Sequence, residues 1–234
     1  MCKEHVIAII PARGGSVGIP NKNLVPLAGK PLLYWTINQA KFSECIDKVL
    51  VSTDSDEISK LALSEGALVV SRPTAISGHN SSSEDAIIHA LETYTKDYNI
   101  NISDITVVFL QATSPLRYPN DIDSSYKYFK EMNYDSLFST SVASDLTLWT
   151  YSNNEWTSAN FDYRDRQTRQ NAPVQYVENG SIYIFNAINL LDTKNRISGR
   201  IGSYVMEPWQ VHEIDEQDDL DLVAYYMGEK LIER

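Results

Sequence analysis

Strand-like and helix-like segments alternate from residue 5 to residue 141, and this alternation constrains the fold more than any other feature. The strand-like runs are short, apolar and rich in β-branched residues, as expected for strands buried on both faces; they cover 5–10, 48–52, 67–70, 105–110 and 136–141. Helices are expected over 31–42, from 54 or 55 onward, from 82 or 83 onward, and over 121–132. This spacing is typical of right-handed βαβ units. It predicts a Rossmann-like, doubly wound α/β fold with a mostly parallel sheet, in one domain over residues 1–234.

Regular alternation stops between residues 143 and 173. This segment is polar but contains Trp149 and Trp156, whose large side chains need a surface to cover. We expect an inserted arm, or small dimerisation subdomain, that packs on a partner subunit; packing on its own domain is the alternative. Strand character returns at 181–185, and a last helix is expected over 217–232.

The overall charge excludes some classes of partner. The chain has 20 Lys and Arg against 31 Asp and Glu, a formal net charge of -11. General nucleic-acid and anionic-membrane binders need a cationic surface, so neither partner is expected. Two cysteines without metal-type spacing predict a reducing compartment. No apolar run approaches the roughly 20 residues of a membrane span, and the short apolar stretch at 6–11 is unlike a signal peptide, so we expect a cytoplasmic protein.

The charge is unevenly distributed, and residues 5–43 contain no acid at all. In this stretch a loop with three glycines follows the first strand and also carries Arg13 and Lys22. Glycines let backbone N–H groups turn toward an anion, so the loop predicts polyphosphate binding; a packing turn is the alternative. Its spacing matches neither G-x-x-x-x-G-K-S/T nor G-x-G-x-x-G, and the next carboxylate is Glu44.

Three loops leave strands at the carboxyl edge of the predicted sheet, where ligands of such sheets bind; they are 11–31, 71–83 and 111–119. The serines at 81–83 can cap a helix or contact a base, and the two roles are compatible. Gln111 and Arg117 begin and close the loop after the most apolar strand, so we expect both side chains to point at a substrate.

Acids are concentrated near the end of the chain, with six of them in residues 213–221. Glu213 and Asp215 are two apart in an extended segment, so their side chains share a face. Adjacent carboxylates repel unless a cation lies between them, and Mg²⁺ (or Mn²⁺) with triphosphate oxygens suits such hard ligands. The later acids are expected to charge the first turn of the last helix.

Taken together, collinear segments along almost the whole chain resemble the acylneuraminate cytidylyltransferases, or CMP-sialic acid synthetases. The matching segments are 12–23, 51–54, 72–73, 110–117, 169–170, 178–183 and 214–215. The resemblance implies a nucleotide-diphospho-sugar transferase type of fold, with CTP and a nine-carbon 2-keto sugar acid as substrates. It also implies Mg²⁺ (or Mn²⁺) as cofactor, and we expect a homodimer.

The same resemblance assigns roles to individual residues. It implies that the nucleotide is held by Arg13, Gly14, Ser16, Lys22 and Asn23 on its phosphate and ribose side, and by Arg72, Ser81 and Ser83 beside the cytosine. The sugar-side residues are Gln111, Arg117, Arg169, Asn179 and Tyr183, and the metal ligands are Asp215 and Glu213. Arg13, Lys22 and Asp215 are the catalytic candidates.

An arginine can bind the sugar carboxylate through two parallel hydrogen bonds, and Arg169 is the first choice for this role. Arg164 and Arg166 are the other candidates for this role. The alternative is that these arginines only form salt bridges in an exposed arm. Two positions depart from the family pattern: Val17 stands where relatives have Lys, and Glu213 where they have Asp.

The expected reaction is in-line attack of the anomeric 2-hydroxyl on the α-phosphate of CTP, releasing pyrophosphate. Positioning and neutralisation of phosphate charge would supply most of the catalysis. The alternatives are another acceptor, such as another nonulosonate, a 3-deoxy-octulosonate or a sugar 1-phosphate, and a nucleotide-binding regulatory module with degraded catalysis.

Overall fold

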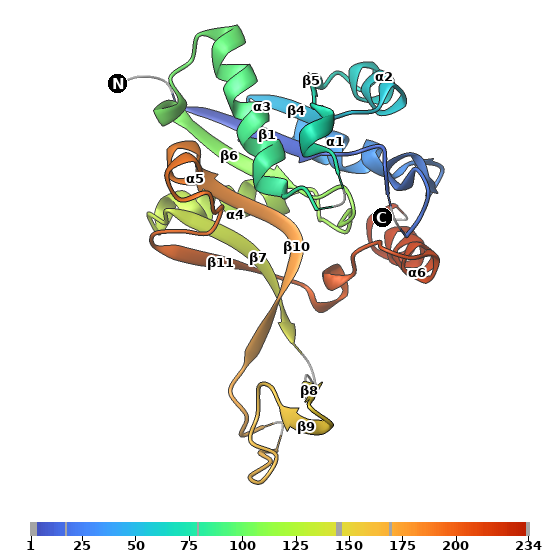
Figure 1. Ribbon diagram of the computed structural model, residues 1–234, viewed down its shortest axis with the longest axis vertical. Coiled ribbons are helices and arrows are strands. Elements are labelled where there is room, and N and C mark those ends of the chain that lie inside the picture. The colour runs from blue at the N-terminus through green and yellow to red at the C-terminus, as the bar shows by residue number, and fades with distance from the viewer. Residues whose placement is uncertain (1–3, 17, 79, 144–146, 169, 233–234) are drawn as a thin grey trace.

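The computed structural model describes residues 4–16, 18–78, 80–143, 147–168 and 170–232, and a seven-stranded sheet forms its centre (Figure 1). In spatial order the strands are β11 (Ile201–Met206), β7 (Ser136–Ala143), β10 (Gln175–Asn186), β6 (Ile105–Leu110), β1 (His5–Pro11), β4 (Lys48–Thr53) and β5 (Leu68–Ser71). Only β10 is antiparallel to its neighbours. The predicted mostly parallel α/β sheet is therefore confirmed.

Helices cover both faces of this sheet. One face carries α1 (Leu32–Phe42), α2 (Asp56–Ser64) and α4 (Asp121–Glu131), and the other carries α3 (Ser83–Tyr98) and α5 (Ala187–Thr193). Along β1, Ala8 and Ile10 pack into the first layer, whereas Ile7 and Ile9 pack into the second. This double burial is why β1 is continuously apolar.

A third, smaller apolar cluster lies beside α1. It joins α6 (Gln217–Met227) to Leu32 of α1 and to Leu27 of a short ribbon formed by β2 (Pro26–Leu27) and β3 (Lys30–Pro31). The chain segment just before α6 carries the predicted metal ligands. The cluster packs this segment against the loop after β1. Within the described ranges, no helix is both long enough and apolar enough to cross a lipid bilayer.

Three elements near the C-terminus differ from the sequence prediction. The strand expected at 181–185 lies in the second half of the 12-residue strand β10. The edge strand β11 was not predicted, because Gly202 interrupts its apolar pattern; a side chain there would collide with the ring of Tyr134. The last α-helix was expected to end at 232 but ends at Met227. Residues Gly228–Ile232 form a π-type turn instead.

A hairpin projects from the sheet where β7 and β10 extend beyond their neighbours (Figure 1). It consists of β8 (Trp149–Ser152) and β9 (Glu155–Ser158), joined by Asn153 and Asn154, which both have positive φ angles, as a tight hairpin turn requires. We call the described residues from 147 to 174 the arm. Its position agrees with the predicted insertion at 143–173, and its packing on a partner subunit stays a prediction.

Candidate active site

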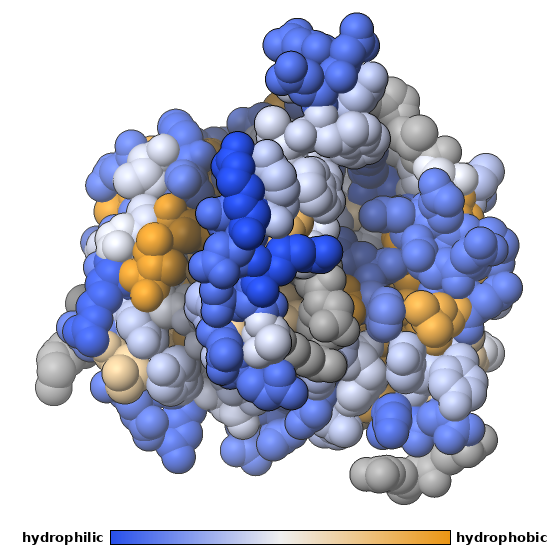
Figure 2. Space-filling view, turned by 90° about the horizontal axis from the view of Figure 1, so that it is seen from below, coloured by the Kyte–Doolittle hydropathy of each residue, from blue (hydrophilic) through white to orange (hydrophobic). Residues whose placement is uncertain are grey.

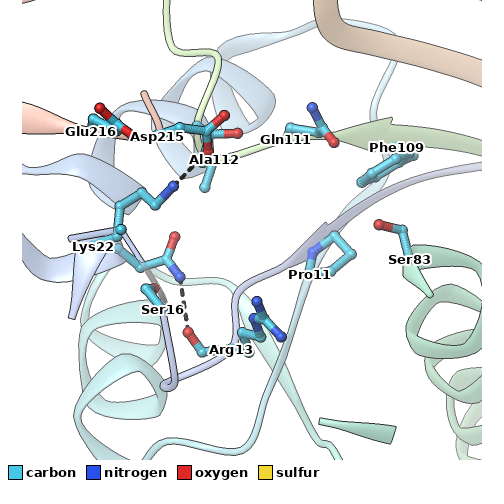
Figure 3. Close-up of a pocket in the computed structure, with 13 residues that line it drawn as sticks. Pro11, Arg13, Ser16, Lys22, Ser83, Phe109, Gln111, Ala112, Asp215 and Glu216 are labelled. Atoms are coloured by element: carbon cyan, nitrogen blue, oxygen red, sulfur yellow. Dashed lines mark hydrogen bonds and ion pairs between the residues drawn. The ribbon is translucent and has the colours of Figure 1, made fainter. Parts of the chain in front are cut away.

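A pocket opens at the point where the strand order reverses. β4 and β5 follow on one side of β1, whereas β6 lies on its other side, and ligands of open α/β sheets bind at such a switch point. The pocket has a volume of about 470 Å³ (Figure 3). Its lining residues are Pro11, Arg13, Ser16, Gly18, Lys22, Asn23, Ser83, Phe109, Gln111, Ala112, Thr113, Asp215 and Glu216.

The glycine-rich loop after β1 forms one wall, and its neighbours hold it by hydrogen bonds. The Gly14 amide donates to Asp54 Oδ1 at 2.8 Å, and Asn23 Nδ2 donates to the Arg13 carbonyl at 3.1 Å. Arg13 Nη1 donates to the carbonyl of Gly78 at 2.8 Å, which ties this loop to the one before α3. Arg13 therefore lines the pocket as expected, whereas Gly14 does not line it, and the Gly14 amide is bound by Asp54 rather than turned toward a ligand. Phosphate binding by this loop stays a prediction.

Lys22 and Asp215 meet on the opposite side of the pocket (Figure 3). Lys22 Nζ lies 2.8 Å from Asp215 Oδ1 and donates to the Ile214 carbonyl, also at 2.8 Å. An ammonium has three donors, so a third N–H can reach an anionic oxygen of a ligand. Gly18 permits the arrangement, because a Cβ at that position would collide with the carbonyl oxygen of Asp215.

The two predicted metal ligands have different partners. Glu213 accepts a long hydrogen bond of 3.4 Å from Gln111 Nε2 and packs against Gly180, where a Cβ would collide with its carboxylate. Burial raises the pKa of Glu213 to about 7, and the negative charges of Asp215 and Glu178 add to the effect. Among the described residues, no group of three His, Cys, Asp or Glu side chains is arranged to hold a metal.

Asp215 nevertheless fits one mode of Mg²⁺ binding. Its side chain is 73% exposed and lines the pocket, so a second carboxylate oxygen is accessible besides the one bound to Lys22. Mg²⁺ in nucleotide sites is commonly held by one or two carboxylates together with substrate phosphates rather than by a cage of protein ligands. Asp215 can contribute in this way without a third acid.

The prediction that Arg117 points at a substrate is wrong. Its side chain is buried, and it donates hydrogen bonds to four protein oxygens: Thr36 Oγ1 at 3.2 Å, Gln39 Oε1 at 2.9 Å, and the carbonyls of Gln111 and Ser181 at 2.8 Å each. Burial lowers the pKa of Arg117 to about 9. Its short loop after β6 turns back into the domain, so the guanidinium binds backbone behind the pocket.

Asn179 and Tyr183 also lie beneath the pocket surface rather than on it. Asn179 is buried; it accepts from Ser139 Oγ at 2.6 Å and donates to Ser141 Oγ at 3.3 Å, both on β7. The Tyr183 hydroxyl donates to the carboxylate of Glu178, and its ring stacks on Phe109 with centroids 5.2 Å apart. Burial and Glu178 raise the pKa of Tyr183. Neither residue lines the pocket directly, contrary to the expected sugar contacts.

Arg72 lies behind the glycine-rich loop. It is buried and donates to Ser52 on β4, with its Nε at 3.1 Å from Oγ and its Nη2 at 2.6 Å from the carbonyl. Burial lowers the pKa of Arg72, and Asp54 opposes this effect. Arg72 is not among the described residues that line the pocket. Its contact with cytosine stays a prediction.

The serines at 81–83 were expected to cap a helix or contact a base, and the structure places the three in different surroundings. Ser82 caps α3 by accepting from the Asp85 amide at 3.0 Å, whereas Ser83 lines the pocket. Ser81 donates its amide to the Gly78 carbonyl and is not among the lining residues. The predicted Arg169 and Val17 lie outside the described residues.

Sequence reasoning missed several lining residues. Phe109 belongs to the most apolar strand and therefore looked like ordinary core, and Pro11 begins the loop 11–31 expected at the pocket but was not singled out. Glu216 stood among acids that looked like a helix start. Thr113 is placed by a bond from the Ile214 amide to its carbonyl at 2.9 Å, a pairing between distant segments with no local signal.

An open α/β sheet with a cationic loop at its switch point is the architecture of a nucleotide-binding protein. A family model described as cytidylyltransferase matches residues 7–215, and the chain belongs to this family. The chain is 34% identical, over 97% of its length, to the N-acylneuraminate cytidylyltransferase of Escherichia coli O18:K1:H7 (strain RS218 / NMEC), and covers 53% of that protein. The proteins of that name from Streptococcus agalactiae serotype V and Oncorhynchus mykiss are 34% and 33% identical over 91% and 94% of the chain, which covers 51% and 49% of them.

The chain thus spans about half the length of the curated relatives it matches. Among solved structures, it is similar to CMP:2-keto-3-deoxy-manno-octonic acid synthetase complexed with CTP, with a TM-score of 0.69 and 16% identity over 97% of this chain and 100% of that one. It is also similar to 4-diphosphocytidyl-2C-methyl-D-erythritol synthase, with a TM-score of 0.69 and 12% identity over 96% and 100%. At these identities the likeness concerns the fold.

Proposed function

We propose that the chain transfers CMP from CTP to the anomeric 2-hydroxyl of a nonulosonic acid and releases pyrophosphate. The observation that carries the proposal is the pocket at the switch point, which is lined by Arg13 and by Lys22 in an ion pair with the exposed Asp215. Two cations suit a triphosphate, and an exposed carboxylate suits a divalent ion between protein and phosphates. The names of the relatives support CTP as the nucleotide and a sialic-type acid as the acceptor.

In this reaction the acceptor oxygen forms a bond to the α-phosphorus while the bond from that phosphorus to the pyrophosphate oxygen breaks. The hydroxyl proton passes to solvent. Arg13 and Lys22 would offset negative charge on the phosphates, and the ion pair with Asp215 would hold the Lys22 ammonium in place. Mg²⁺ held by Asp215, with Glu213 as a further candidate, would supply Lewis-acid neutralisation of the phosphate oxygens.

Pyrophosphate release tests the proposal. The purified chain is incubated with Mg²⁺, one of the four nucleoside triphosphates, and one of a panel of sugar acids and sugar 1-phosphates. We expect release only with CTP and a nine-carbon 2-keto sugar acid, and none after chelation of the metal. Turnover only with 3-deoxy-octulosonate or a sugar 1-phosphate would show that this compound, and not a nonulosonic acid, is the acceptor. CTP binding without turnover would show that the chain is a nucleotide-binding module.

We also propose that the chain acts as a homodimer, with the arm at the interface. The arm exposes Trp149, Tyr151 and Trp156, the last at 65% of its surface. Next to the arm, Val142 on β7 pairs with Tyr176 on β10, and both side chains are exposed. Figure 2 views the molecule from the end where the arm projects, and most of that face is hydrophilic. A second copy would cover these side chains.

Light scattering during size-exclusion chromatography tests this assembly. We expect a dimer for the unaltered chain and a shift toward monomer for Trp156→Ser, because the substitution removes a large apolar contact. Phe42→Ser is the matched control, since Phe42 is 82% exposed at the end of α1, outside the arm. A monomeric unaltered chain, or equal dissociation by both substitutions, would contradict the proposal.

A further inference from the structure

Arg196 lies directly behind one wall of the pocket, in the segment between α5 and β11. Its guanidinium carbon is 4.4 Å from the ring centroid of Tyr183 and 5.4 Å from that of Phe109, two rings that stack on each other. Its Nη1 also lies 2.6 Å from Glu84 Oε1 in the first turn of α3. One side chain thus connects three elements that are distant in sequence.

Two of these connections end at residues next to, or in, the pocket wall. Phe109 itself lines the pocket, and Glu84 directly follows Ser83, which also lines it. Figure 3 shows Ser83 and Phe109 at the same side of the pocket, one carried by α3 and the other by β6. Arg196 therefore contacts one component of this wall, Phe109, directly and the other, Ser83, through its neighbour Glu84.

The chemistry of the contact favours precision over stability. A guanidinium held against aromatic faces and paired with a carboxylate is restrained in position and orientation, and the side chains of Arg196 and Glu84 are only 20% and 21% exposed. Yet Arg196 Nε is buried, and among the described residues it has no hydrogen-bond partner of good geometry. The ring contacts and the ion pair thus fix the position of the guanidinium, while the unsatisfied Nε offsets part of the stability that they add.

We propose that Arg196 is a positioning residue, which holds Ser83 and Phe109 in the arrangement that binds the nucleotide. The inference rests on the proposed function for the identity of the nucleotide. Displacement of a binding group by about 1 Å can cost as much as a hundredfold in activity, so loss of this brace should affect CTP much more than the melting temperature.

The first test compares Arg196→Met with Arg200→Met. Arg200 belongs to the same segment and lies over the ring of Tyr134 at 5.5 Å, but it is exposed and is not among the residues that line the pocket, so it is a matched control. Calorimetric titration should show CTP affinity reduced at least about tenfold by Arg196→Met and unchanged by Arg200→Met. Hydrogen exchange should increase in the first turn of α3 and at the end of β6 in the Arg196 variant only.

A second test asks whether the effect passes through Ser83. If it does, Arg196→Met should cost much less affinity in a Ser83→Ala background than in the unaltered chain, because coupled residues are non-additive. Additive losses, or unchanged affinity and exchange in Arg196→Met, would overturn the proposal. If Arg196→Met fails to fold, Glu84→Gln removes the same ion pair with its shape retained and should give the same two changes.

These readouts separate this inference from the proposed function. Hydrogen exchange in α3 and β6 needs no ligand, so it tests the brace even if the unaltered chain binds another nucleotide. Failure of CTP binding or turnover in the unaltered chain would overturn the proposed function and leave the exchange result standing.

Discussion

Replacing Asp215 by Asn is expected to reduce pyrophosphate release about a thousandfold and to leave the fold intact. The Asp215 side chain is 73% exposed, so its charge contributes little to the core. It does hold the Lys22 ammonium and offers the accessible carboxylate for Mg²⁺. Loss of about 4 kcal/mol of transition-state stabilisation corresponds to about a thousandfold in rate. Steady-state kcat/KM over a Mg²⁺ titration measures this loss, with a thermal melt on the same preparation.

Asp218→Asn is the control for this substitution. It makes the same change of charge three residues away, at an exposed position in the first turn of α6, where an acid contributes only about 0.3–1 kcal/mol through the helix dipole. We expect its activity to match that of the unaltered chain. Near-normal turnover of Asp215→Asn, or an equal loss in both variants, would remove Asp215 from the catalytic machinery.

Replacing Arg117 by Met is expected to lower the free energy of unfolding by about 3 kcal/mol. The substitution removes the donor of four oxygens, two in buried hydrogen bonds and two in partly buried ones, at a cost of about 1–3 kcal/mol for each buried group that stays unsatisfied. Removal of a buried cation also removes its desolvation cost, which offsets part of the loss. For a chain of this size the melting temperature should fall by about 6–12 °C.

Arg200→Met serves as the control here too, because an exposed position should change stability by no more than about 0.5 kcal/mol. Arg117→Lys keeps the charge but has three donors in place of the five of the guanidinium, so we expect an intermediate melting temperature. Calorimetry of the three variants decides the matter. A melting temperature of Arg117→Met equal to that of the control would show that these hydrogen bonds do not stabilise the fold.

Most of the fold was predictable because its signals are local. The buried parallel strands show as continuous apolar runs, and Ser55 and Ser82 cap helices that begin where their positions predicted. The edge strand β11 was missed because its pattern depends on the contact between Gly202 and Tyr134. That contact joins segments far apart in the sequence, and no periodicity records it.

Site residues were predictable where their surroundings in the sequence allow one role, and not where a side chain could bind either a ligand or the protein itself. Arg13 and Lys22, in a stretch without acids, line the pocket as expected. Arg117 and Asn179 occupy equally suggestive positions, yet both turn inward and bind the protein itself. Sequence shows that a polar side chain follows a buried strand, but its direction depends on acceptors contributed by distant segments.

Strand β10 joins the arm to the pocket. It runs without interruption from the base of the arm into the centre of the sheet, and its register shifts between Glu178 and Tyr183. Gly180 lies in this shift with a φ of +64° and touches the side chains beside the pocket. A bulge bends its strand and increases the local twist, so β10 changes direction at this point between the arm and the centre of the sheet. One strand therefore joins the base of the arm to the side chains beside the pocket, and its irregular point at Gly180 lies next to Glu213 and Gln111.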